Sequence, residues 1–130
     1  MNQVVEFIKN CQCFYIATCE GDQPRVRPFG AIAEIDGKTY ICLNNQKKVF
    51  QQLLANPKIE ICAYNGEKWL RLEAKAHRDD RVEAREAMLN ANPGLRRMYA
   101  ADDGLYEVFY LTDGKATISS FTADPVEIAL

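Results

Sequence analysis

The chain has 130 residues, with 16 Lys or Arg against 18 Asp or Glu and a formal net charge of −2. This length is typical of one domain, and the slight acidic excess argues against a general nucleic-acid binder, which carries a basic excess. No stretch approaches the ~20 apolar residues of a membrane helix, and five cysteines without a secretion signal predict reduced thiols in the cytoplasm. We therefore expect a single cytoplasmic domain over residues 1–130, with neither nucleic acid nor membrane as a partner.

The N-terminal part of the chain predicts a short helix followed by two strands. Residues 2–10 place apolar side chains at helical spacing, which is typical of an amphipathic helix. Residues 13–19 are β-branched and aromatic, and they end at the turn-like residues 20–23. A second strand is expected over about residues 25–35.

Three dipeptides are typical of tight β-turns: Asp36-Gly37, Asn65-Gly66 and Asp113-Gly114. The two-residue hairpin turn needs positive φ at both central positions, which Asp, Asn and Gly tolerate. We expect hairpins joining residues 25–35 to 40–43, 59–64 to 69–77, and 106–111 to 116–121. With the first strand, these make an antiparallel meander of about seven strands, which favours a closed or nearly closed barrel.

Two helical segments interrupt this meander. Residues 47–55 carry apolar side chains at i, i+3 and i+4, and Asn56-Pro57 ends the helix because the residue before proline resists the α region. The asparagines at 44–45 are good N-caps for it. Residues 80–91 begin with a relative of the capping box, and a helical turn is expected around residues 95–99. The fold class is α+β with a dominant barrel.

The strand Arg25-Val26-Arg27-Pro28-Phe29 is unusual for its two arginines. Alternate residues of a strand share a face, so Arg25 and Arg27 place two permanent cations together. Pro28 removes a ladder donor, and Gly30 permits close approach to the backbone. Two interpretations remain open: an edge strand with solvated arginines, or a wall against which a flat, anionic ligand lies.

Lys47 and Lys48 fall in the first turn of the expected helix. Lysines are disfavoured there by the helix dipole, by about 0.3–1 kcal/mol each. A bound phosphate reverses that sign, because free N–H groups and ammonium groups then face the same anion. Together with the arginine strand, these lysines predict a phosphate-binding corner.

Trp69 lies on the polar face of an alternating strand that covers residues 69–77. A large aromatic side chain there indicates contact with a ligand or a second subunit, and an isolated exposed aromatic is the alternative. His77, the sole histidine, is expected at the surface. No nucleophile motif or phosphate-binding loop is present, so any reactivity would come from a cofactor.

The chain resembles the pyridoxamine 5′-phosphate oxidase-like family in the order of its segments. These are the short helix, the strand QPRVRPFG, the Asp-Gly hairpin, the segment YICLNNQKKV and the segment LLANPKI. The resemblance covers nearly the whole chain and is strongest over residues 21–64. It implies an antiparallel split β-barrel of about six or seven strands with short flanking helices. It also implies a homodimer that holds FMN in clefts between its subunits.

The resemblance also assigns residues to the cofactor. It implies that Arg25–Phe29 line the isoalloxazine ring, that Arg27 reaches towards the phosphate or ribityl chain, and that Trp69 approaches the flavin from the partner subunit. The complete set of FMN-binding residues that it implies is Arg25, Val26, Arg27, Pro28, Phe29, Cys42, Leu43, Asn44, Lys47, Lys48 and Trp69.

The C-terminal residues 119–130 lack the Arg/His substrate motif of true pyridoxamine phosphate oxidases, so oxidation of vitamin B6 is not expected. The chain is more similar to small flavin reductases of the nitroimidazole-resistance type. The resemblance therefore implies an FMN-dependent oxidoreductase that passes hydride or electrons between reduced flavin and a small, flat acceptor. The alternatives are a non-catalytic FMN carrier or redox sensor, and a split barrel that binds haem or a deazaflavin.

Overall fold

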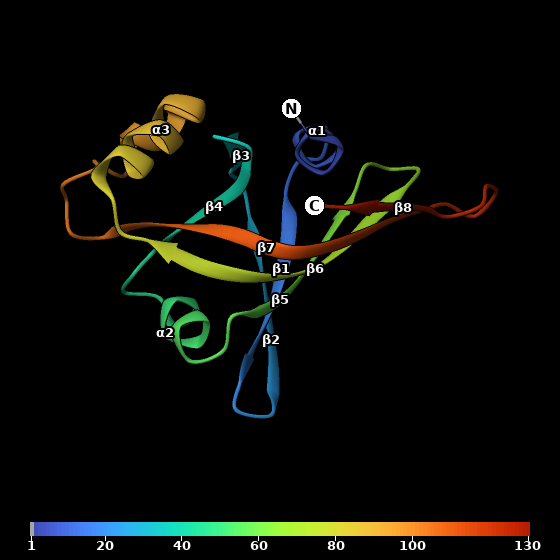
Figure 1. The fold of residues 1–130 in the computed structure, drawn as a ribbon, viewed down its shortest axis with the longest axis horizontal. Helices are drawn as coiled ribbons and strands as arrows, with labels where there is room; N and C mark the ends of the chain where they lie inside the picture. Colours follow the sequence, from blue (N-terminus) through green and yellow to red (C-terminus); the bar gives the residue numbers. More distant parts are fainter. Residues whose placement is uncertain (1) are drawn as a thin grey trace.

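The computed structural model describes residues 2–130, which form eight β-strands, three α-helices and one 3-10 helix (Figure 1). The strands are β1 (Phe14–Glu20), β2 (Gln23–Phe29), β3 (Ile32–Ile35), β4 (Lys38–Asn44), β5 (Lys58–Tyr64), β6 (Trp69–Asp79), β7 (Tyr106–Ser119) and β8 (Val126–Ala129). The helices are α1 (Gln3–Lys9), α2 (Lys48–Ala55), α3 (Val82–Ala91) and the 3-10 helix η1 (Pro93–Arg97). Within residues 2–130, no helix is both long enough and apolar enough to cross a membrane.

The strands form one antiparallel sheet with the order β2-β1-β5-β6-β7-β4-β3, and β8 pairs with the C-terminal part of β7. The two ends of this order, β2 and β3, are joined only by Gly30 and Ala31. Three extended residue steps span about 11 Å at most, so the sheet curls until its two edges nearly meet. The result is a barrel that is split along one seam. The predicted α+β split barrel is confirmed.

The strand expected over residues 25–35 is in fact two strands, β2 and β3. The chain leaves one edge of the sheet at Phe29 and joins the other edge at Ile32, so the two halves pair with different neighbours. β2 pairs only with β1, which accommodates Pro24 and Pro28 because an edge strand can lack backbone donors.

The Asp-Gly pairs have two different outcomes. At Asp36-Gly37 both φ angles are positive, at 51° and 77°, and the predicted hairpin between β3 and β4 is confirmed. The hairpin predicted at Asp113-Gly114 is wrong, because residues 106–119 form the single strand β7. Only Asp113 of that pair has a positive φ, at 55°, and the pairing with β6 shifts register nearby. A single left-handed residue makes a β-bulge, whereas the tight turn needs two.

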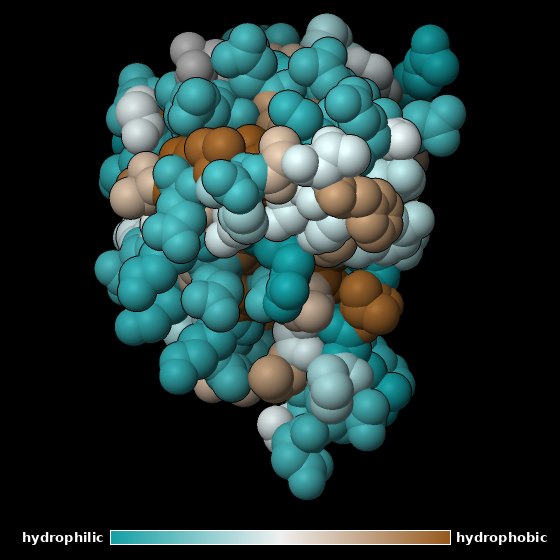
Figure 2. All heavy atoms as spheres, turned by 90° about the vertical axis from the view of Figure 1, so that its right-hand side faces the viewer, coloured by the Kyte–Doolittle hydropathy of each residue, from teal (hydrophilic) through white to brown (hydrophobic). Residues whose placement is uncertain are grey.

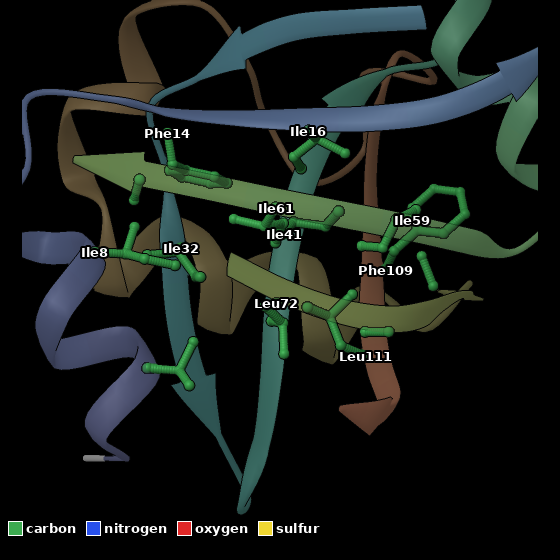
Figure 3. Packing of buried hydrophobic residues seen from close by; sticks show 14 of the residues in the cluster. Ile8, Phe14, Ile16, Ile32, Ile41, Ile59, Ile61, Leu72, Phe109 and Leu111 are labelled. Atoms are coloured by element: carbon green, nitrogen blue, oxygen red, sulfur yellow. The ribbon is translucent and has the colours of Figure 1, made fainter. Parts of the chain in front are cut away.

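The barrel interior is filled by aliphatic and aromatic side chains from α1, α2 and the inward face of the strands (Figure 3). Those labelled there are Ile8, Phe14, Ile16, Ile32, Ile41, Ile59, Ile61, Leu72, Phe109 and Leu111. Each such side chain contributes roughly 1.5–3 kcal/mol on burial. Phe50 of α2 packs edge-on against Phe109, with ring centroids 6.1 Å apart. This contact fixes α2, and therefore its N-terminus, against the barrel.

A second apolar cluster lies between α3 and the opposite face of β3, β4 and β7. Its buried members are Ala31, Ala33, Tyr40, Ala84, Met88, Leu89, Ala101, Tyr106 and Val108. The predicted capping box of α3 is wrong, because the N-cap is Arg81 and no side chain caps the helix. Instead, the Tyr40 hydroxyl donates to Asp79 Oδ2 at 2.7 Å, and Arg81 Nη2 donates to the same oxygen at 2.9 Å.

Candidate functional site

A cleft of about 900 Å³ lies beside the seam, between α3, β4 and the start of α2. Figure 1 shows β4 running from the α3 side of the molecule towards α2. Its lining residues are Arg27–Ala31 at the β2–β3 connection, Cys42–Asn44 at the end of β4, Lys47–Val49 at the start of α2, Ala91–Leu95 at the end of α3 and in η1, Met98 and Tyr99. The volume is within the usual range of small-molecule and cofactor sites.

Most residues that the resemblance assigned to the cofactor line this cleft: Arg27, Pro28, Phe29, Cys42, Leu43, Asn44, Lys47 and Lys48. Three others do not. Arg25 is exposed and its Nη2 lies 2.9 Å from Glu20 Oε1. Val26 is on the opposite face of β2 from Arg27 and is exposed. Trp69 packs against Phe121 at 5.0 Å between ring centroids, on the outer face of the sheet.

The sequence did not indicate the wall formed by the end of α3 and by η1, from Ala91 to Leu95, or the nearby Met98. The helix stop at Asn92-Pro93 is visible in the sequence, and the short helical turn is confirmed. However, a local stop signal does not show which part of the sheet the turn covers.

Arg27 supplies a fixed positive charge at the cleft. Its Nη1 donates to the Ile16 carbonyl at 3.1 Å and to Thr18 Oγ1 at 2.9 Å, and its Nη2 donates to Gln52 Oε1 at 2.8 Å. Within residues 2–130 it has no carboxylate partner within 4.0 Å. Burial, together with the nearby charge of Arg25, lowers the pKa of Arg27, but a guanidinium remains protonated at neutral pH.

The start of α2 opens on the same cleft. Lys47 is the N-cap residue and makes no capping bond with its side chain, and the first turn contains no acidic residue. The predicted asparagine caps are wrong: Asn44 Oδ1 accepts from the Gln46 N–H at 2.9 Å, and Asn45 Nδ2 donates to Glu107 at 2.9 Å. The free N–H groups of the first turn and the exposed ammonium groups of Lys47 and Lys48 therefore fit a phosphate group.

Cys42 and Tyr106 form the floor of the cleft and the layer below it. Burial raises the pKa of the Cys42 thiol to about 11, so it stays protonated and is a poor nucleophile. Burial also raises the pKa of Tyr106, and the nearby Cys42 thiol adds to this effect. The Tyr106 ring packs on Tyr99 with centroids 5.1 Å apart. Its buried hydroxyl has no hydrogen-bond partner among residues 2–130.

Tyr106→Phe should therefore stabilise the fold. A buried hydroxyl without a partner costs about 1–3 kcal/mol, so we expect the free energy of unfolding to rise by about 1 kcal/mol and the melting temperature by about 4 °C. Thermal unfolding followed by circular dichroism measures this. Tyr99→Phe, which alters a less buried tyrosine, is the matched control and should change stability little. A loss of stability in Tyr106→Phe would mean that the hydroxyl has a partner.

A comparison with family models matches residues 1–128 to the family described as pyridoxamine 5′-phosphate oxidase. The chain belongs to the pyridoxamine 5′-phosphate oxidase family. A search of curated proteins found no match.

The chain is also similar to solved structures. It is similar to a NimC/NimA family protein from Clostridium acetobutylicum, with 49% identity and a TM-score of 0.96 over 98% of this chain and 90% of that one. General Stress Protein 26 from Bacillus anthracis shares the fold at 17% identity, with a TM-score of 0.76 over 96% of this chain and 94% of that one. A heme binding protein from Mycobacterium smegmatis also shares it, at 16% identity, with a TM-score of 0.73 over 99% of this chain and 59% of that one.

Proposed function

We propose that the chain binds FMN in the cleft and passes hydride or electrons between the reduced flavin and a small, flat acceptor. The observation that carries this proposal is the uncapped start of α2, where Lys47 and Lys48 lie at the same cleft as the Arg27 guanidinium. Membership of a family whose members commonly bind flavin supports it. The reducing cytoplasm remains the proposed compartment, and all five cysteines are free thiols.

Each part of the cleft has a role in this proposal. Lys47, Lys48 and the first-turn N–H groups of α2 hold the phosphate, and Arg27 reaches the phosphate or ribityl chain. Pro28 and Phe29 line the isoalloxazine ring together with residues 42–44. The bound flavin supplies the hydride or electron chemistry. The fixed cations of the cleft favour the negative charge that a flavin gains on reduction, because opposite charges attract strongly in a partly buried site.

We also propose that two copies of the chain form a homodimer through the outer face of the sheet. The strand register places Pro28 opposite Tyr15 and Val26 opposite Ala17 on this face, and Tyr64 opposite Trp69. Its exposed large apolar side chains include Tyr15, Val26, Tyr64 and Phe121. A patch of this kind is unusual for a soluble monomer. Figure 2 shows part of this side of the molecule, where brown and white spheres interrupt the teal surface.

In such a dimer, Val26 and Trp69 would lie at the interface between the subunits. Their position outside the cleft of one protomer is compatible with a contact from Trp69 to the flavin of the other subunit. This assignment of Trp69 stays a prediction.

Size-exclusion chromatography with absorbance detection tests the cofactor and the assembly together. We expect a yellow species of twice the 14.8 kDa chain mass that releases FMN on denaturation. A colourless protein, or one with a Soret band, would contradict the FMN proposal, and the latter would indicate haem. Turnover of NAD(P)H with nitro or quinone acceptors then separates an enzyme from a flavin carrier or redox sensor.

A further inference from the structure

Two buried polar side chains lie behind the cleft and do not line it. Thr18 and Gln52 are 2% and 6% exposed. Thr18 Oγ1 donates to Gln52 Oε1 at 2.5 Å, and the same oxygen accepts from Arg27 Nη2 at 2.8 Å. Buried polar groups in an otherwise apolar interior are costly unless they are bonded. Thr18 and Gln52 bond directly to each other, and both accept from Arg27.

The contacts of Arg27 fix the plane of its guanidinium. Nη1 donates to the Ile16 carbonyl and to Thr18, and Nη2 donates to Gln52. A guanidinium has five N–H donors. Within residues 2–130, the Arg27 Nε–H and the second Nη2–H have no backbone or side-chain acceptor. Because Arg27 lines the cleft, these two donors remain for a ligand.

The acceptor that holds Arg27 is a neutral amide. The nearest carboxylate in this network belongs to Glu20, whose Oε1 is paired with Arg25 at 2.9 Å. Glu20 Oε2 accepts from Gln52 Nε2 at 3.4 Å. Arg25 is thus paired with the Glu20 carboxylate, whereas the neutral Gln52 amide lies between Glu20 and Arg27. A carboxylate at position 52 would orient Arg27 equally well but would also neutralise it.

We propose that Thr18 and Gln52 are positioning residues that hold the Arg27 guanidinium towards the cleft without cancelling its charge. Gln52 thereby makes the cleft selective for a phosphorylated flavin over the same flavin without phosphate. The inference rests on the proposed function for its ligand, although the orientation of Arg27 can be measured without one.

The test exchanges the charges of two neighbouring residues. The double variant Glu20→Gln/Gln52→Glu keeps the net charge and the amide–carboxylate contact, but places the carboxylate beside Arg27. Glu20→Gln alone is the matched control. Relative to this control, we expect affinity for FMN to fall by at least about tenfold, because hydrogen bonds to charged groups contribute on this scale. We expect affinity for riboflavin and the melting temperature to stay nearly unchanged.

Two outcomes would overturn the proposal. Unchanged FMN affinity would show that the neutrality of position 52 is irrelevant. An equal loss for FMN and riboflavin together with a lower melting temperature would show a purely structural role.

If the unaltered protein binds neither flavin, the proposed function fails, and NMR of the Arg27 Nε–H in the ligand-free protein decides the inference. The inference is supported if the Arg27 Nε–H is rigid in the unaltered protein and mobile in Gln52→Leu. It also requires that inorganic phosphate changes the chemical shift of this Nε–H only when residue 52 is not Glu. Equal mobility in both proteins, or no shift with phosphate, would overturn it.

Discussion

Replacing both Lys47 and Lys48 with alanine is expected to lower the affinity for FMN by at least about a hundredfold. Each ammonium–phosphate contact contributes about 1.5–3 kcal/mol as a hydrogen bond between charged groups, and every 1.4 kcal/mol is tenfold in affinity. Affinity for riboflavin should change little, because the lost contacts reach only the phosphate. Titration of each flavin into apoprotein, followed by flavin fluorescence, measures both values.

The stability of the apoprotein should move in the opposite direction. Without a phosphate, the two lysines oppose the helix dipole at the start of α2 by about 0.3–1 kcal/mol each. The double alanine variant should therefore melt slightly higher than the unaltered apoprotein. Lys9→Ala/Lys58→Ala, which removes two exposed lysines outside the cleft, is the matched control and should leave FMN affinity unchanged. Undiminished FMN affinity in the Lys47/Lys48 variant would place the phosphate elsewhere.

Asp79→Ala is expected to lower the free energy of unfolding by about 2 kcal/mol and the melting temperature by roughly 8 °C. The Tyr40 side chain is 1% exposed, and Asp79 is the acceptor of its hydroxyl. Removing the carboxylate leaves that hydroxyl buried and unpaired. Asp80→Ala is the control, because the Asp80 side chain is 72% exposed and forms ion pairs with Arg78 and Arg85 at the surface, and such pairs contribute about 0–1 kcal/mol. Equal losses in the two variants would contradict this account.

The same carboxylate should give the protein a defined acid sensitivity. Hydrogen bonds from Arg81, and then from Tyr40, hold the pKa of Asp79 well below its ordinary value. Because the folded pKa lies below the unfolded value of about 3.9, the contribution of Asp79 is fully present above about pH 5. It declines as the pH falls below that range. The stability difference between the unaltered protein and Asp79→Ala should therefore narrow from pH 5 towards pH 2, as measured by urea unfolding. A constant difference would be inconsistent with this mechanism.

The local signals of the sequence predicted the elements that depend on neighbouring residues. Asn56-Pro57 ends α2 as expected, and the Asp36-Gly37 turn forms because both residues adopt positive φ. Asp113-Gly114 has the same letters as a hairpin turn but forms a bulge. The outcome there depends on β6, which pairs with both halves of β7 and keeps it as one strand. A dipeptide carries no information about that distant partner.

The candidate site was predicted only in part, because local sequence signals do not show contacts with distant parts of the chain. Arg25 and Arg27 do share a face of β2, opposite Thr18 and Ile16. Their roles differ because Glu20, across the hairpin, pairs with Arg25 and leaves Arg27 without a carboxylate partner within residues 2–130. Strand alternation predicts the shared face, but only the folded hairpin determines which arginine is neutralised.

The seam between β2 and β3 passes beside the cleft, and its single covalent bridge, Gly30 and Ala31, lines the cleft as well. Arg27 and Phe29 lie on one side of the seam, and residues 42–44 of β4 lie on the other. A ligand that contacts both sides therefore bridges the seam. Opening the barrel at the seam then requires the ligand's binding free energy in addition to the free energy of separating the two edges. Opening of the barrel and dissociation of the ligand are thus coupled.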